Sequence, residues 1–220
     1  MTSLESLDRD ALIALQGQRL QRLLAAVYGR NLFYTRKLDK AGVRVDALTL
    51  PDDLRVLPFT TRQELVSDQE ANPPWGTALT EPIENYTRFC QTSSTSGHPL
   101  KWVDTNESWQ WMLECKKAVY RAAHVTAADR AFFPFSFGPF LGFWAGFEAG
   151  CQLGVHCVPG GGMSSQLRLA TIRTVGATVL FCTPTYALRL AEGAAAERAD
   201  PPLSTGTVRL VIVGGEPGGS

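Results

Sequence analysis

The chain is 220 residues long, and 45% of its residues are hydrophobic, 10% aromatic and only 19% charged. Its 21 Lys and Arg residues balance its 21 Asp and Glu residues, so the formal net charge is zero. This composition excludes a disordered chain and argues against a nucleic-acid binder that neutralises phosphates with a basic surface. The length is ample for a buried core and suits one large domain or two small ones.

The first 80 residues are predicted to form a helical arm with a linker. Apolar residues recur at three- and four-residue spacing over residues 4–28, which indicates an amphipathic helix, and Thr2 with Glu5 can form a capping box at its start. A second short helix is expected over residues 34–40.

A third short helix is expected after Thr61, where Glu64 stands at the capping-box position. Residues 72–82 contain three prolines and a glycine, and we interpret them as a linker between the helical arm and the remainder of the chain.

After residue 82 the pattern changes to alternating strands and helices. Strands are expected over residues 86–91, 101–104, 131–135, 155–159, 177–182 and 208–213, and helices over residues 105–123, 141–153, 165–175 and 185–196. Strands that return through helical crossovers predict right-handed βαβ units and a mostly parallel sheet. The expected fold class is therefore α/β, with the arm and linker in residues 1–80 and a partial α/β domain in residues 81–220.

The termini and the cysteines favour a cytoplasmic protein. The N-terminus lacks the apolar core of a signal peptide, and the uncharged run over residues 131–147 is interrupted by prolines and glycines, so we interpret it as buried core and not as a membrane span. The five cysteines are scattered and odd in number, as is typical of reduced thiols. Cys151, His156 and Cys157 form the tightest cluster, but no second pair completes a tetrahedral set, so ordinary thiols are favoured over a metal site.

A polar loop, TSSTSGHP, occupies residues 92–99 between two expected strands. Its hydroxyl groups and backbone N–H groups can wrap a polyphosphate, although a polar hairpin loop has the same composition. The Walker pattern is absent.

Three further segments follow expected strands. The PGGGMSS segment at residues 159–165 fits either an anion site at a helix N-terminus or a tight turn. The GGEPGG turn at residues 214–219 lets a planar ring approach the backbone, or it is an ordinary loop. The third segment, at residues 132–144, holds an aromatic cluster that packs the core or leaves a flat apolar slot for an aromatic acyl group: Phe132, Phe133, Phe135, Phe137, Phe140, Phe143 and Trp144.

In this order, the segments resemble the N-terminal part of a phenylacetate–CoA ligase-like member of the adenylate-forming (AMP-binding) superfamily. The similarity runs from LQGQRLQRLLAAVYGRNLFYTRKLDKAGV and LPFTTRQEL through TSSTSGHP and GVHCVPGGGMSSQ to GATVLFCTPTYALRLAE and VRLVIVGGEPGG. The resemblance implies a cytoplasmic acid–thiol ligase that uses ATP, Mg²⁺ and CoA. A small aromatic, phenylacetate-like acid would become an acyl-adenylate and then a CoA thioester, with neither nucleic acid nor membrane as a partner.

The resemblance also implies the site residues, although it assigns no secure catalytic residue and no protein-held metal in this chain. The phosphates of ATP would lie against Thr92, Ser93, Ser94, Thr95, Ser96, Gly97 and His98. Adenine would lie against Gly214, Gly215, Glu216 and Pro217. The acyl group would lie near Phe135, Phe137, Phe140, Tyr186 and Gly215.

Two positions depart from the family pattern. Ser94 stands where the loop's first glycine is usual, and its side chain restricts the backbone. His98 stands where a lysine is usual, so the cation beside the phosphates is titratable, and we expect weaker pyrophosphate stabilisation.

The family's later segments, including the ribose-binding Asp and the mobile domain with its adenylation Lys, have no counterpart before Ser220. We therefore expect a fragment of an aryl-acid CoA ligase that is inactive alone. The alternatives are a non-catalytic ATP- or acid-binding module and a protein that forms homodimers through the helical arm.

Overall fold

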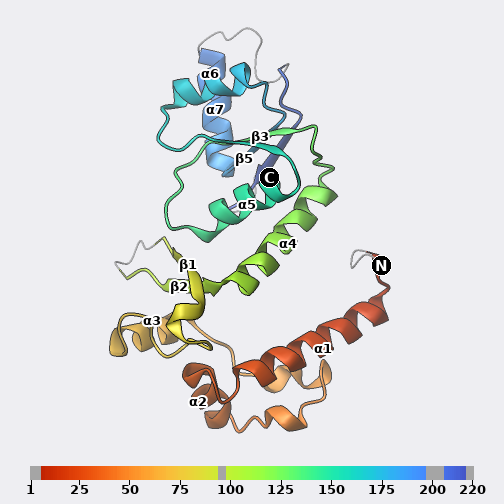
Figure 1. The fold of residues 1–220 in the computed structure, drawn as a ribbon, viewed down its shortest axis with the longest axis vertical. Coiled ribbons are helices and arrows are strands. Elements are labelled where there is room, and N and C mark those ends of the chain that lie inside the picture. The colour runs from red at the N-terminus through yellow and green to blue at the C-terminus, as the bar shows by residue number, and fades with distance from the viewer. Residues whose placement is uncertain (1–5, 94–97, 197–205, 217–220) are drawn as a thin grey trace. The chain divides into compact units, whose positions relative to one another are not determined.

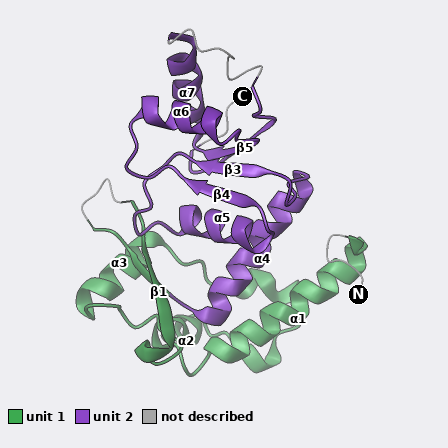
Figure 2. Ribbon diagram, turned by 45° about the horizontal axis from the view of Figure 1, so that its top comes forward, with its two compact units in different colours: residues 1–103 green, residues 104–220 purple. Residues whose placement is uncertain are grey.

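The fold is taken from a computed structural model that describes residues 6–93, 98–196 and 206–216 (Figure 1). The chain divides into two compact units, residues 1–103 and 104–220 (Figure 2). The sequence pattern placed this division near residue 80 instead. The strand pair after residue 85 goes with the first unit, because the Gln69 side chain exchanges two hydrogen bonds with the backbone of Lys101, at 2.8 and 3.1 Å.

The first unit is mainly helical. Its helices are α1 (Arg9–Val27), α2 (Leu32–Lys40) and α3 (Arg62–Ala71), its 3₁₀ turns are η2 (Val45–Ala47), η3 (Asp52–Val56) and η4 (Ile83–Asn85), and β1 (Tyr86–Gln91) pairs with β2 (Lys101–Thr105). The first helix begins later than expected, because the Asp8 carboxylate accepts a hydrogen bond from the Ala11 N–H and caps it there. The predicted capping pair, Thr2 and Glu5, lies outside the described residues.

The third helix has the predicted capping box: the Thr61 hydroxyl accepts from the Glu64 N–H, and the Glu64 carboxylate accepts from the Thr61 N–H. A hydrogen bond from Lys37, followed by those from Thr61, lowers the pKa of Glu64 to about 2.

The expected linker is packed against the arm. The Asp68 carboxylate accepts hydrogen bonds from the Thr77 N–H and hydroxyl, both at 2.6 Å. The Asn31 amide donates to the Ala78 carbonyl and to the Thr80 hydroxyl. These four bonds make the proline-rich segment part of the first unit.

The second unit has the predicted α/β architecture. Its elements are α4 (Asn106–Ala122), β3 (Arg130–Phe133), α5 (Leu141–Gln152), β4 (His156–Pro159), α6 (Ser165–Thr174), β5 (Val179–Cys182), α7 (Pro184–Ala196) and β6 (Leu210–Val213). The four strands form one parallel sheet in the order β4-β3-β5-β6. Among the described residues, no helix is long and apolar enough to cross a membrane.

Helices cover both faces of this sheet (Figure 2). Residues of α6 and α7 pack with Phe132 and Leu180 in one hydrophobic cluster. On the other face α4 and α5 pack together, and the Phe133 ring lies 5.2 Å from that of Phe147. Both faces are therefore largely buried at the central strands β3 and β5, as is typical of parallel sheets, whereas Val211 and Val213 of β6 are exposed.

A buried carboxylate joins three of the strands at their amino ends. Asp129, only 5% exposed, accepts from Arg209 Nε at 3.0 Å and Nη2 at 2.6 Å. It also accepts from the Thr178 hydroxyl at 2.7 Å and from the Thr126 N–H at 2.9 Å. The Arg209 guanidinium, and less strongly these neutral donors, hold the pKa of Asp129 well below its ordinary range. The approaches to β3, β5 and β6 are thereby fixed to one another.

We predict that Asp129→Ala lowers the free energy of unfolding by about 2 kcal/mol, because a buried carboxylate is removed and its donors, the half-exposed Arg209 among them, lose their acceptor. Urea denaturation at pH 7 measures this loss. Because folding lowers the pKa of Asp129, its contribution is complete above the ordinary carboxyl pKa and is lost as the pH falls through the folded value. The difference between wild type and variant should therefore shrink below about pH 4.

Asp46→Ala is the matched control, since Asp46 pairs with Arg44 on an exposed surface. An equal effect of the two substitutions would contradict the role given to Asp129.

Candidate functional site

The carboxyl ends of the four parallel strands meet at one edge of the sheet. The strands end at Phe133, Pro159, Cys182 and Val213. The Gly160 N–H donates to the Phe133 carbonyl at 2.9 Å, and the Gly214 N–H donates to the Cys182 carbonyl at 3.2 Å. The loops after the strands therefore start at the same level, which is where α/β sheets bind ligands.

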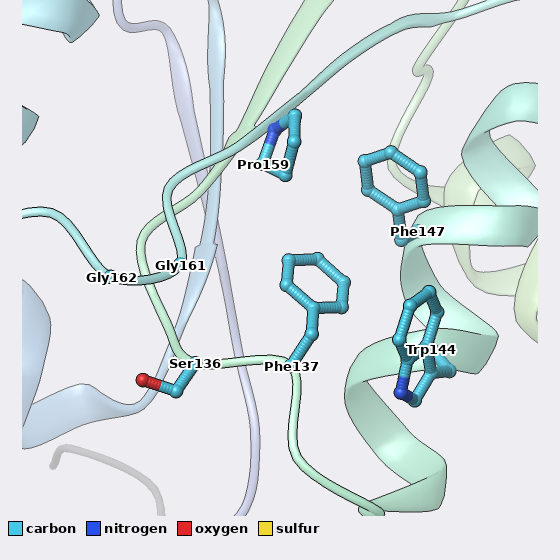
Figure 3. Close-up of a pocket in the computed structure, with 7 residues that line it drawn as sticks. All are labelled: Ser136, Phe137, Trp144, Phe147, Pro159, Gly161 and Gly162. Carbon is cyan, nitrogen blue, oxygen red and sulfur yellow. The ribbon is translucent and has the colours of Figure 1, made fainter.

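A hollow of about 450 Å³ opens at this edge (Figure 3). It is lined by the β3–α5 loop, by α5, and by β4 with the turn after it: Ser136, Phe137, Trp144, Phe147, Pro159, Gly161 and Gly162. In Figure 3 the Phe137 ring projects between Pro159 and the two rings carried by α5. Its centroid lies 4.9 Å from that of Trp144 and 5.3 Å from that of Phe147.

The lining is almost entirely apolar in character. The indole N–H of Trp144 is satisfied, since it donates to the Gly138 carbonyl at 3.0 Å. A side chain at Gly161 would meet the Phe137 ring at 3.5 Å, so glycine there keeps this side of the hollow open. The shape and chemistry suit a flat apolar group.

The predicted acyl-pocket aromatics divide between the hollow and its support. Phe137 lines the hollow. Phe135 and Phe140 instead pack on Phe143, with ring centroids 3.9 and 6.1 Å away.

Of the other lining rings, Phe147 was absent from the predicted aromatic cluster. Trp144 belonged to that cluster but was not among the residues that the resemblance places near the acyl group. Their three-residue spacing on an expected helix was the available signal, because it places both on one face.

Tyr186, expected near the acyl group, does not line this hollow. Its hydroxyl accepts from Arg168 Nη1 at 2.6 Å, and its ring lies 5.1 Å from the guanidinium carbon. Arg168 Nε donates in turn to the Gly160 carbonyl at 2.9 Å. Tyr186 thus braces, through Arg168, the turn that carries Gly161 and Gly162.

The turn after β6 is tied to the start of α7. The Glu216 carboxylate accepts from the Thr185 N–H at 3.1 Å and from its hydroxyl at 2.5 Å, and these bonds lower the pKa of Glu216. Gly215 adopts a φ of 87°, which favours glycine. Gly214, Gly215 and Glu216 are all exposed, and Pro217 lies outside the described residues.

The predicted phosphate loop belongs to the first unit. The Thr92 hydroxyl accepts from the Leu100 N–H at 3.0 Å and so closes the base of the loop. The His98 carbonyl accepts from Arg62 Nη2 at 2.7 Å, and its imidazole Nδ1 lies 3.4 Å from Glu70 Oε1. Ser93 is exposed, and residues 94–97, which include Ser94, Thr95, Ser96 and Gly97, lie outside the described part of the chain.

Within the described ranges, no three His, Cys, Asp or Glu side chains gather as a metal site needs. The sequence cluster around His156 therefore provides no such group.

We predict that Tyr186→Phe lowers the free energy of unfolding by about 1 kcal/mol, because Arg168 loses the acceptor that holds it under the turn. Amide hydrogen exchange should become faster over residues 160–162. Tyr28→Phe is the control, since it removes a surface hydrogen bond to Asp39. Unchanged exchange at the turn in Tyr186→Phe would contradict the bracing role.

The chain matches no family model. It is 34% identical over 192 residues to a phenylacetate-coenzyme A ligase of Thermus thermophilus. This alignment covers 86% of the present chain and 41% of the Thermus protein. A phenylacetate-coenzyme A ligase of Escherichia coli is 30% identical over 190 residues, covering 86% of this chain and 42% of that protein.

Among solved structures, a 2-hydroxyisobutyryl-CoA ligase in complex with 2-HIB-AMP and CoA superimposes with a TM-score of 0.89. The two sequences are 22% identical, and the superposition covers 97% of this chain and 45% of the ligase chain. The chain thus spans less than half the length of the relatives that it matches. Over that length the chain is similar in sequence to phenylacetate–CoA ligases and has the fold of the corresponding part of an acyl-CoA ligase.

Proposed function

We propose that the chain supplies the acid-binding surface and part of the nucleotide-binding surface of an ATP-dependent, AMP-forming acid–CoA ligase. In the first step the substrate carboxylate attacks the α-phosphate of ATP, which releases pyrophosphate and leaves an acyl-adenylate. In the second step the CoA thiol attacks the acyl carbon, and AMP leaves. The observation that carries the proposal is an aromatic hollow and a glycine turn at one edge of a sheet whose homologues are phenylacetate–CoA ligases.

The hollow favours an aromatic acid such as phenylacetate. Phe137, Trp144 and Phe147 offer ring faces and edges to a flat substituent. An apolar pocket distinguishes ligands by about 1–3 kcal/mol per methylene. We therefore propose a preference for the arylacetate class over short aliphatic acids.

The turn after β6 would form a wall for adenine. Because the Glu216 carboxylate is occupied by Thr185, adenine would meet the backbone of Gly214 and Gly215. Because this backbone is already held in place, binding of adenine would not require the loss of entropy that ordering a loop costs.

The loop over residues 92–98 would hold the phosphates with hydroxyl and N–H groups. Its described cation candidate, His98, lies beside the Glu70 carboxylate, which offsets positive charge on the imidazole. Negative charge on departing pyrophosphate would then receive less stabilisation than from a lysine. Mg²⁺ would accompany ATP, and the described residues offer no cluster of His, Cys, Asp or Glu ligands for it.

Binding of a hydrolysis-resistant phenylacetyl-adenylate analogue, measured by calorimetry, tests the proposal in the 220-residue chain. We predict that Phe137→Ala weakens binding by about tenfold, because a buried ring contact of about 1–2 kcal/mol is lost. Phe140→Ala is the matched control, because that ring packs on Phe143 outside the lining. Failure of the wild-type chain to bind the analogue would overturn the proposed function.

Pyrophosphate release tests whether the 220-residue chain is active alone. Release by the 220-residue chain with ATP and phenylacetate would contradict the expectation that it is inactive alone. Binding of the analogue or ATP without release fits both a ligase part and a non-catalytic binding module.

We also predict that His98→Lys raises the affinity for ATP by about two- to fivefold at low salt, because a fixed cation replaces an imidazole at an exposed site. The gain should shrink as salt is added. His156→Lys adds the same charge at an exposed position, the first residue of β4, and serves as the control. An equal gain in both variants would show that net charge, and not the loop, attracts the nucleotide.

A further inference from the structure

A tight turn folds the end of α5 back onto the start of β4. The Gly154 N–H donates to the Cys151 carbonyl at 3.0 Å, and the Val155 N–H donates to the Gly150 carbonyl at 3.1 Å. Gly154 adopts a φ of 77°, which lets the chain reverse within three residues. Cys151 in the last turn of the helix and Cys157 in the strand are thereby brought together.

The side chains of Cys151 and Cys157 interact directly, and both are free thiols. Cys157 is half-buried and packs against the helix backbone at Gly150, where a Cβ would come 2.7 Å from its Sγ. Cys151 is exposed. The pair therefore consists of one thiol that faces solvent and one that is held behind it.

We propose that Cys151 and Cys157 are a peroxide-sensitive dithiol that closes to an intramolecular disulfide. The inference is independent of the proposed ligase function, since it rests on the two thiols and not on the hollow.

The chemistry needs hydrogen peroxide as oxidant and proceeds in two steps. The Cys151 thiolate attacks one peroxide oxygen, the O–O bond breaks, and hydroxide leaves, so that Cys151 becomes a sulfenic acid. Cys157 then attacks the Cys151 sulfur, and the S–S bond forms as water leaves. In total two thiols and one hydrogen peroxide give one disulfide and two waters.

The environments of the thiols assign their roles. Burial, and then the neighbouring Cys151, raises the pKa of the Cys157 thiol, so it is a poor initial nucleophile. The exposed Cys151 meets the oxidant first, and Cys157 resolves the sulfenic acid.

The other cysteines provide internal controls. Cys90 and Cys182 are buried, and burial raises the pKa of Cys182 to about 11. Cys115 is exposed on α4 and tests whether exposure alone suffices.

Peptide mapping of the whole chain tests the proposal. The reduced protein is treated with hydrogen peroxide, alkylated and digested with trypsin, which leaves both cysteines in the peptide of residues 131–168. We expect this peptide to lose two hydrogens and to take no alkyl groups. Chymotryptic cleavage after Leu153 should give two fragments that separate only on reduction. Wild type and Cys115→Ser should behave alike.

A second measurement traps the sulfenic acid with dimedone. In Cys157→Ser the label on Cys151 should rise by at least about tenfold over wild type, because no resolving thiol remains. Equal labelling in both proteins, or a disulfide through Cys115 in its place, would overturn the proposal. If Cys157→Ser fails to fold, the wild-type map decides alone, since the absence of the 151–157 link overturns it.

The two thiols also lie on α5 and β4, two elements that line the hollow. Helix α5 carries Trp144 and Phe147, and β4 ends at Pro159 just before Gly161, so a disulfide would restrain two walls of the hollow together. Peptide mapping detects the disulfide in the absence of any ligand. Its failure would leave the proposed ligase function intact, and absence of ligand binding would leave the dithiol intact.

Discussion

The buried Asp129 carboxylate fixes where three parallel strands begin. Arg209, Thr178 and Thr126 all donate to it, so the approaches to β3, β5 and β6 are held at one level. In a parallel sheet a common starting level and a fixed register also set where the strands end. The loop of Phe137, the start of α7 and the turn of Gly215 consequently open on the same edge.

The hollow at that edge is an extension of the hydrophobic core. Phe133 in the core touches Phe147, which touches Phe137 at the surface. Rings that already pack against one another lose little freedom when a further ring is added, which suits an aromatic ligand. Around them, Arg168 and Glu216 fasten the two neighbouring turns to helices α6 and α7.

The helices and strands could be predicted because their signals are local. The capping box of Thr61 and Glu64 lies within four residues of sequence, and the predicted helices are present. Where two local signals compete, the predicted boundary was wrong: α1 begins after Asp8 and not near residue 4. The roles of Trp144 and Tyr186 depend on how helices turn over the sheet and on a partner, Arg168, far away in sequence. Spacing alone does not determine such contacts.

The ion pair at Asp129 also has an evolutionary consequence. It lies at the amino ends of the strands, whereas the hollow lies at their carboxyl ends. Ring positions such as Phe137 can therefore exchange residues without disturbing the fastening that orders the strands. In such a scaffold the lining of the hollow can change from one sequence to another while the contacts that order the strands stay the same.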